Sequence, residues 1–429
     1  LVGIINDQGV GAAGIESSLN SMLAGVNGKY IYANGRGNII PGSEQVSVEA
    51  KSGTSIRLTI DRDVQWVAQN AISQAVASSR AKSGTVIVMD PKTGAILAQA
   101  SAPTFDPNIS SSITLEKLKN PAVQEVYEPG STGKVITVAA AMQEGLISPD
   151  TIFTIPYSMK VSDGVFSDHE KHPTQRLTTT GLLAVSSNTG SIQIGQKLGK
   201  DNLYDYLRKF GIGESTNSKL PGESVGILHP VKDWSGTSLP TISFGQGYSV
   251  TAMQSTSVFA TIANNGVRVK PSILAGVVDE SGKYTPAKPN ESVKVLSDET
   301  AINLRAMMES VVSKNGTAPT AAIPGYRVAG KTATANRYND ICGCYSGFTA
   351  SFIGFAPSDA PRYVISVTIQ DPKGMHWGGY LGGPVFKKVM SFVLQSKGIA
   401  PTGTKVIPIA LTEKQLLAER KLIADKKAA

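Results

Sequence analysis

The sequence predicts an α+β fold in which a long helical region separates two groups of strands. Residues 84–101 form the first group, an expected hairpin with two apolar runs joined by an Asp-Pro-Lys-Thr-Gly turn. Three more strand-like runs follow much later, at 325–335, 351–357 and 362–371. Helical patterns fill the interval, so we expect one antiparallel sheet with helices inserted between its early and late strands.

Length and composition indicate a folded protein with more than one domain. The chain has 429 residues, of which 41% are hydrophobic and 17% charged, enough for a large core. Residues 1–53 are rich in glycine and small polar side chains and lack a long amphipathic pattern, so we expect a small separate N-terminal domain there. We place the main domain at 54–400 and a charged C-terminal helix or tail at 401–429.

The main domain opens with a short alternating strand and a helix within 54–76, and it closes with a helix at 382–395. The apolar face expected for the first helix comprises Val64, Val67, Ala68, Ala71, Ile72 and Ala75. The inward face of the closing helix comprises Val385, Phe386, Val389 and Phe392. The expected helices between them are 131–145, 178–198, 201–210, 250–264 and 297–313.

Charge and cysteine content narrow the function classes. The net charge is +8, but lysines and arginines are scattered and form no basic stripe with interleaved aromatics, so we expect no nucleic-acid partner. An anionic envelope polymer or membrane surface fits this charge equally well. Cys342 and Cys344 are too few for a disulfide framework or a zinc site, so we expect two loop thiols. No metal or cofactor motif is present, and we expect no cofactor.

Residues 127–142, "YEPGSTGKVITVAAAM", place Ser131 and Lys134 three positions apart. A phosphate-binding loop is excluded because Val135 follows Gly133-Lys134 and position 128 is not glycine. A serine nucleophile activated by lysine fits better, because Ser131 would lie in the first helical turn and a buried Lys134 would lose its charge readily. The buried face expected for this helix comprises Val135, Val138, Ala139, Met142 and Leu146.

Two further fragments have the chemistry that such a site needs. Ser186 could pass a proton to a leaving group, and Asn188 could hold a backbone amide. On the strand after Gly330, the Lys331 charge and the hydroxyls of Thr332 and Thr334 could face a substrate carboxylate, with a backbone N–H as an oxyanion donor. The order S-x-x-K, S-x-N, K-T-x is a strong combination.

These motifs resemble those of the class B penicillin-binding proteins, the monofunctional transpeptidases of bacterial cell-wall synthesis. The resemblance covers nearly all of residues 9–400 and includes "GVGAAGIES", "LTIDRDVQ", "ASAPTFDPN", "FGQGYSVTAMQ" and "IPGYRVAGKTATA". It implies a penicillin-binding, serine β-lactamase-like fold: a five-stranded antiparallel sheet with helices on both faces and an all-helical subdomain. Residues 1–53 would then be the C-terminal part of the family's N-terminal pedestal domain.

The resemblance also implies how the site acts. Ser131 would attack the bond between the terminal D-alanines of a peptidoglycan stem peptide, with Lys134 as the general base. Ser186 and Lys331 would carry the proton to the leaving amine, and an amine of a neighbouring strand would resolve the acyl-enzyme. The N–H groups of Ser131 and Thr334 would form the oxyanion hole. The substrate-binding residues would be Thr332, Ala333 and Thr334, and β-lactams would acylate Ser131.

Two positions depart from the family pattern. Ala333 replaces the usual glycine of lysine-threonine-glycine, and its methyl group could tighten or reshape the site. Gly133 stands where many members have an aromatic residue, which could loosen the packing behind the helix.

Three alternatives remain open. A class A β-lactamase needs a glutamate in E-x-x-L-N, and "ESSLN" at 16–20 precedes Ser131 in the expected pedestal. A D,D-carboxypeptidase and a catalytically weak scaffold are the other two.

By resemblance we expect an extracytoplasmic catalytic domain on the cell membrane, held by a single-pass anchor absent from this chain. No run of about 18 apolar residues occurs, and a first residue of Leu1 indicates a fragment or processed form. The expected partners are a membrane glycosyltransferase and proteins of division or elongation.

Overall fold

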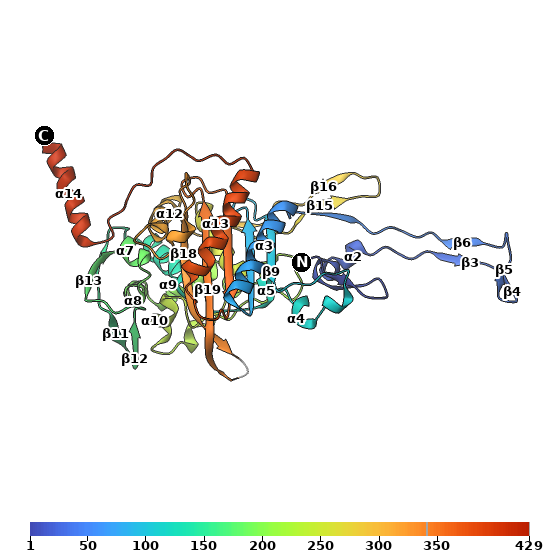
Figure 1. The fold of residues 1–429 in the computed structure, drawn as a ribbon, viewed down its shortest axis with the longest axis horizontal. Helices are drawn as coiled ribbons and strands as arrows, with labels where there is room; N and C mark the ends of the chain where they lie inside the picture. Colours follow the sequence, from blue (N-terminus) through green and yellow to red (C-terminus); the bar gives the residue numbers. More distant parts are fainter. Residues whose placement is uncertain (340–341, 429) are drawn as a thin grey trace.

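The computed structural model describes residues 1–339 and 342–428, and its centre is a five-stranded antiparallel sheet (Figure 1). The strand order is β18-β19-β20-β8-β9, so the late strands pair with the early hairpin through β20 and β8. The five strands are β8 (Ser83–Met89), β9 (Ile96–Ala102), β18 (Ala329–Asn339), β19 (Cys344–Ala356) and β20 (Tyr363–Gln370). The α+β prediction and all five predicted strands are confirmed.

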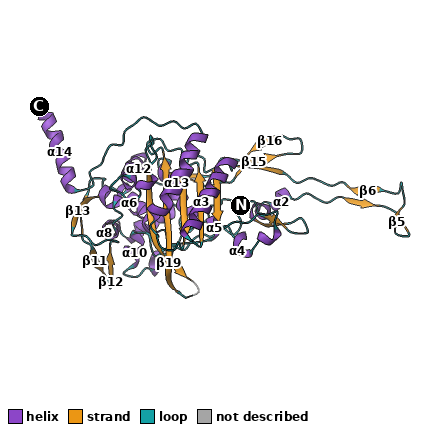
Figure 2. Cartoon of the chain, in the orientation of Figure 1, coloured by secondary structure: helices purple, strands orange, loops and turns teal. Residues whose placement is uncertain are grey.

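Helices cover both faces of this sheet (Figure 2). On one face, α3 (Arg62–Ser79) and α13 (Gly378–Ser396) pack on each other and on the alternate residues that include Val86 and Val367. On the other face, α11 (Ala252–Ala263) packs on the residues that include Ile87. Because successive strand side chains point to opposite faces, one hydrophobic sheet can hold two layers of helices.

The predicted apolar faces are largely the buried ones. Val64, Ala68, Ala71 and Ile72 of α3 are buried, and Val67 and Ala75 are partly buried. Val385, Phe386 and Val389 of α13 are buried as well, and Phe392 is partly buried. The Asp61 carboxylate accepts the N–H groups of Asp63 and Val64 and caps the start of α3.

A helical region lies beside the β18 edge of the sheet, and its elements begin and end as follows. It contains α6 (Lys134–Gln143), α7 (Thr179–Ala184), α8 (Asn188–Leu198), α9 (Lys200–Lys209), α10 (Ser238–Ser243) and α12 (Asp298–Val312). Short helices elsewhere are α1 (Gly14–Ser18), α2 (Asn20–Leu23), α4 (Leu115–Leu118) and α5 (Pro121–Gln124). Single 3₁₀ turns are η1 (Ser110–Ser112), η2 (Gly130–Thr132), η3 (Val231–Asp233) and η4 (Pro319–Ala321).

Two helix predictions are wrong in detail. The helix expected at 178–198 is interrupted between α7 and α8, because Ser186 adopts a left-handed conformation (φ 63°) and Ser187 caps α8. The helix expected to reach residue 145 ends at Gln143, so Leu146 lies beyond it and is 43% exposed.

The strand expected near residue 55 exists, but it does not join the central sheet. β7 (Ser55–Leu58) pairs with β15 (Leu274–Val278), which pairs with β16 (Tyr284–Pro286). Four strands between 152 and 178 were not predicted: β10 (Ile152–Ile155), β11 (Ser158–Val161), β12 (Gly164–Ser167) and β13 (Gln175–Thr178). A further ribbon joins β14 (Val267–Val269) to β17 (Ser292–Lys294).

An arm of N-terminal strands and the C-terminal helix project from the body in opposite directions (Figure 1). The N-terminal strands are β1 (Ile4–Ile5), β2 (Gly11–Ala13), β3 (Lys29–Ile31), β4 (Asn34–Gly35), β5 (Asn38–Ile39) and β6 (Gln45–Val48), and β3 to β6 form a long narrow arm. The helix predicted in the tail is present as α14 (Glu413–Ala428). The domain boundaries at 53 and 400 stay predictions. Among the described residues, no helix combines the length and hydrophobicity that a membrane span requires.

Candidate active site

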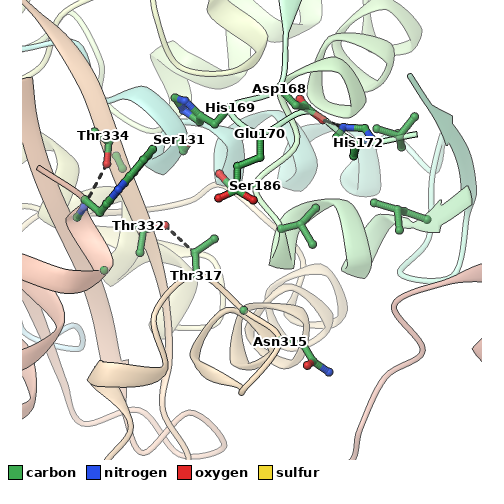
Figure 3. Close-up of a pocket in the computed structure, with 18 of the residues that line it drawn as sticks. Ser131, Asp168, His169, Glu170, His172, Ser186, Asn315, Thr317, Thr332 and Thr334 are labelled. Carbon is green, nitrogen blue, oxygen red and sulfur yellow. Dashed lines mark hydrogen bonds and ion pairs between the residues drawn. The ribbon is translucent and has the colours of Figure 1, made fainter. Parts of the chain in front are cut away.

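A cavity of about 530 Å³ lies between the β18 edge of the sheet and the helical region (Figure 3). Its walls come from at least six separate parts of the chain, so no single segment of sequence describes it. They include Ser131, segment 168–172, Val185 and Ser186, segments 315–317 and 332–334, and segment 377–379. Predicted site residues from all three motifs therefore meet at one cavity.

Ser131 is held at the start of α6 by a tight backbone contact. It lies in η2 and is 8% exposed. The N–H of Gly130 donates to the carbonyl of Gly245 at 2.8 Å, and a Cβ at Gly245 would lie 1.8 Å from the Gly130 oxygen, so only glycine fits there. Within the described residues, Ser131 Oγ makes no hydrogen bond. Its hydroxyl is thus free to react at the positive end of the α6 dipole.

Lys134, three residues after this serine, is a buried lysine. Its side chain is 1% exposed, and Nζ donates to the Ser186 carbonyl at 2.5 Å, to Asn188 Oδ1 at 2.7 Å and to Ser186 Oγ at 3.3 Å. Burial lowers the pKa of Lys134 from 10.5 to about 7, and the charge of Asp168 opposes this shift. A lysine with this pKa is half neutral near pH 7, as a general base requires.

Lys331 is the second buried lysine of the site. It is fully buried, and its Nζ donates to Ser186 Oγ at 2.8 Å and to the Thr332 carbonyl at 3.1 Å. Burial and the nearby charge of Lys134 lower the pKa of Lys331 well below 10.5. The Ser186 hydroxyl therefore lies between two lysines that repel each other when both are protonated. This position suits it to proton transfer.

Ser186 and Asn188 are positioned by a carboxylate that the sequence reasoning missed. The Asp168 carboxylate accepts the N–H of Asn188 at 2.5 Å, the N–H of Thr189 at 3.0 Å and the Ser187 hydroxyl at 2.8 Å. Asn188 Nδ2 donates to the Ser167 carbonyl at 2.9 Å, which leaves Oδ1 facing Lys134. Asp168 thus fixes the turn that places Ser186. It follows β12 in a segment without periodicity, so no sequence signal identified it.

Three consecutive residues of β18, Thr332, Ala333 and Thr334, line the cavity. Thr332 Oγ1 lies 2.7 Å from Thr317 Oγ1, a contact drawn in Figure 3. The Thr334 hydroxyl accepts the Gly378 N–H at 3.1 Å and donates to the His376 carbonyl at 3.5 Å. The Thr334 side chain therefore holds the start of α13, whereas the Thr332 hydroxyl contacts Thr317, another side chain of the cavity wall.

Two aromatic rings from distant segments of the chain meet at the cavity wall. The ring of His169 meets the edge of Trp377 with 5.7 Å between ring centroids. Burial lowers the pKa of His169, and the charge of Lys134 adds to this effect. Neither ring was predicted as part of the site, because His169 and Trp377 lie outside the three motifs.

Comparison with known proteins agrees with this geometry. The family model described as the penicillin binding protein transpeptidase domain matches residues 84–391. The chain belongs to this family. It is 39% identical over 411 residues to penicillin-binding protein PbpB of Mycolicibacterium smegmatis, covering 93% of this chain and 63% of PbpB. It is 33% identical over 404 residues to the probable peptidoglycan D,D-transpeptidase PenA of Neisseria flavescens, covering 92% of this chain and 97% of PenA.

A solved structure supports the same assignment. The crystal structure of penicillin-binding protein 3 from Mycobacterium tuberculosis, complexed with ampicillin, matches with a TM-score of 0.88 and 36% identity, covering 96% of this chain and 90% of the other. The chain is thus a class B penicillin-binding protein, and the fold that its motifs implied is confirmed. It spans less than two thirds of the length of PbpB.

The two departures from the family pattern have structural consequences. Ala333 is 2% exposed, and its methyl faces Gly130, where an added Cβ would lie 3.5 Å away. The looser packing expected at Gly133 is wrong, because the Tyr248 hydroxyl already fills that space at 2.4 Å from where a Cβ would lie.

The expectation of two loop thiols is also wrong. Cys342 and Cys344 form a disulfide, with 5.2 Å between their Cα atoms. Gly343 between them has a φ of 61°, which lets the chain turn tightly enough to bring the two sulfur atoms together.

Proposed function

We propose that this penicillin-binding protein is a D,D-transpeptidase that cross-links peptidoglycan stem peptides through an acyl-enzyme on Ser131. The observation that carries the proposal is the Ser186 hydroxyl, which contacts Lys331 Nζ at 2.8 Å and Lys134 Nζ at 3.3 Å beside the Ser131 cleft. Two buried lysines joined by one hydroxyl can take a proton from the nucleophile and return it to the leaving group.

In the acylation step, neutral Lys134 accepts the Ser131 proton while Oγ attacks the carbonyl between the two D-alanines. The N–H groups of Ser131 and Thr334 stabilise the negative oxygen of the tetrahedral intermediate. Ser186 and Lys331 deliver a proton to the leaving D-alanine nitrogen, and Asn188 binds the substrate backbone. The same Asn188 side-chain amide that would bind the substrate also accepts a hydrogen bond from Lys134 Nζ through its Oδ1.

We assign the carboxylate of the donor peptide first to the Thr332 hydroxyl, which faces the cavity beside Thr317. The Thr334 hydroxyl joins it only by releasing the His376 carbonyl. Ala333 contributes the strand backbone between them. An acceptor amine then attacks the acyl-enzyme, so the cross-link replaces the D-alanine bond.

The test is mass spectrometry of the intact protein after incubation with a penicillin, comparing the native chain with Ser131→Ala. A lasting adduct on the native chain alone supports Ser131 as the nucleophile of a transpeptidase. Fast turnover of the drug without an adduct would indicate a β-lactamase instead. The Glu16 of "ESSLN" does not line the cavity, so it does not support that outcome.

We also propose that the catalytic domain acts outside the cytoplasmic membrane, where peptidoglycan is assembled, and that a membrane anchor holds it there. A membrane glycosyltransferase and division or elongation proteins are the proposed partners. The N-terminal arm supports such contacts, because exposed apolar side chains on a two-stranded ribbon are unusual in an unpartnered protein. Those on the arm are Tyr30, Ile31, Tyr32, Ile39, Ile40, Val46 and Val48.

A further inference from the structure

One carboxylate on the wall of the catalytic cleft has no hydrogen-bond partner among the described residues. Glu170 lies in the loop between β12 and β13, and it lines the cavity with Ser131 and Ser186. Figure 3 shows its side chain pointing into the cavity beside Ser186. Over residues 1–339 and 342–428 no hydrogen bond or ion pair to Glu170 is found, whereas Asp168, two residues earlier, has several.

The loop that bears Glu170 is fixed on both sides. Asp168 binds the start of α8, as described above. His172 Nε2 lies 3.0 Å from the Asp168 carboxylate, and its Nδ1 lies 2.8 Å from the Pro173 carbonyl. Glu170 therefore lies in a short segment whose flanking residues, Asp168 and His172, are held by hydrogen bonds. A group held in this way loses less freedom when it binds a ligand than one on a mobile loop.

The charge of Glu170 is not neutralised by the catalytic lysines. Lys134 and Lys331 are fully buried and bind Ser186, and Lys171, which also lines the cavity, forms no ion pair in the described part of the chain. A fixed negative charge at this wall attracts a cation. It also repels the donor carboxylate, which is thereby directed toward Thr332 on the other wall.

We propose that Glu170 binds the acceptor of the transfer reaction, a peptide whose primary amine arrives as an ammonium ion. This inference rests on the proposed transpeptidase function, because it names the second substrate of the same site. In the transfer, the amine nitrogen forms a bond to the acyl carbon and the acyl bond to Ser131 Oγ breaks. The ammonium loses two protons in all: one returns to Ser131 Oγ and the other is released to solvent.

The experiment measures the ratio of two reactions of the acyl-enzyme: transfer to an amine and hydrolysis by water. The enzyme is acylated by a thioester donor at constant pH, with either Nα-acetyl-lysine amide, whose side chain is an ammonium, or hydroxylamine, which is neutral. Glu170→Gln keeps the shape and removes the charge. Asp163→Asn removes the same charge from the β11–β12 turn, outside the cavity lining, and serves as the matched control.

We expect Glu170→Gln to lower the ratio of transfer to hydrolysis roughly tenfold for the lysine amide and to leave it unchanged for hydroxylamine, since a charge-assisted contact is lost. Asp163→Asn should change neither ratio. Normal acylation with an unchanged ratio in Glu170→Gln overturns the inference and leaves the proposed function intact. A longer-lived acyl-enzyme in water alone would also overturn it, because Glu170 would then activate water. If the native enzyme forms no Ser131 adduct, the proposed function itself fails, and the inference fails with it.

Discussion

The rate at which a penicillin acylates Ser131 should depend on pH through Lys134. Burial sets the pKa of Lys134 at about 7, and only the neutral amine can accept the serine proton. The neutral fraction rises with pH, so the second-order acylation rate should rise with pH as well. From a pKa of about 7, the neutral fraction is about 1% at pH 5, about 9% at pH 6 and about 90% at pH 8.

The assay is stopped-flow or quenched acylation by one penicillin between pH 5 and 9, with adducts counted by mass spectrometry. We expect a slope of about tenfold per pH unit below pH 7 and a plateau above pH 8. A rate that is flat between pH 5 and 8, or one that falls as pH rises, would refute the assignment of Lys134 as the base.

Both Lys134 and Lys331 have lowered pKa values, so either could cause the pH dependence of acylation. A variant at Asn188 distinguishes the two lysines. Asn188 Oδ1 accepts from Lys134 Nζ at 2.7 Å, whereas the hydrogen bonds of Lys331 Nζ in the described part of the chain go to Ser186 and Thr332. Asn188→Asp places a carboxylate on the charged form of Lys134, which should raise its pKa by about one to three units. The rate at pH 7 should then fall at least about tenfold, and the midpoint should move to higher pH. An unmoved midpoint would assign the titration to another group.

The free energy of unfolding should also depend on pH through Lys134. The pKa of Lys134 is lower in the folded chain than the ordinary 10.5, so between about pH 7 and 10.5 the unfolded chain binds one more proton at this residue. The free energy of unfolding should therefore increase with pH in that window by about 1.4 kcal/mol for each tenfold fall in proton concentration. Lys134→Met should lose this part of the slope in urea titrations.

Two further predictions concern Asp168 and Ala333, which lie beside the proposed catalytic residues. Asp168→Asn should lower the free energy of unfolding by about 2 kcal/mol, because hydrogen bonds to a charged acceptor are weakened. It should also move the acylation midpoint to lower pH, because the charge that raises the pKa of Lys134 is gone, and an unmoved midpoint would contradict this. Ala333→Gly should cost about 1 kcal/mol, since a buried methyl is lost and the strand becomes more flexible. Urea unfolding measures it, and a gain in stability would show that the methyl strains the strand against Gly130.

The main elements of the fold could be predicted because each has a local pattern. The strands β8, β9 and β20 contain apolar runs bounded by turns, and the helices α3 and α13 repeat apolar residues at helical spacing. Weakly patterned elements were missed. The ribbons β10–β13 and β11–β12 are built from strands of only four residues each, which is too short for an alternating pattern to stand out in the sequence.

Sequence by itself identified the candidate groups, because Ser131, Lys134, Ser186, Asn188 and Lys331 stand in recognisable motifs. In the structure Ser131 and Ser186 line the cavity, and Lys134 and Lys331 are buried beside Ser186. Their catalytic roles stay proposals. Only the tertiary structure decided the pKa values, the hydrogen bonds and the positions of these groups. The pKa of Lys134, the shared Ser186 hydroxyl, the Asp168 cap and the placement of Glu170 in the cleft all depend on burial and on contacts between distant segments. Such properties cannot be read from spacing, because desolvation and hydrogen bonding depend on neighbours that folding, and not sequence order, brings together.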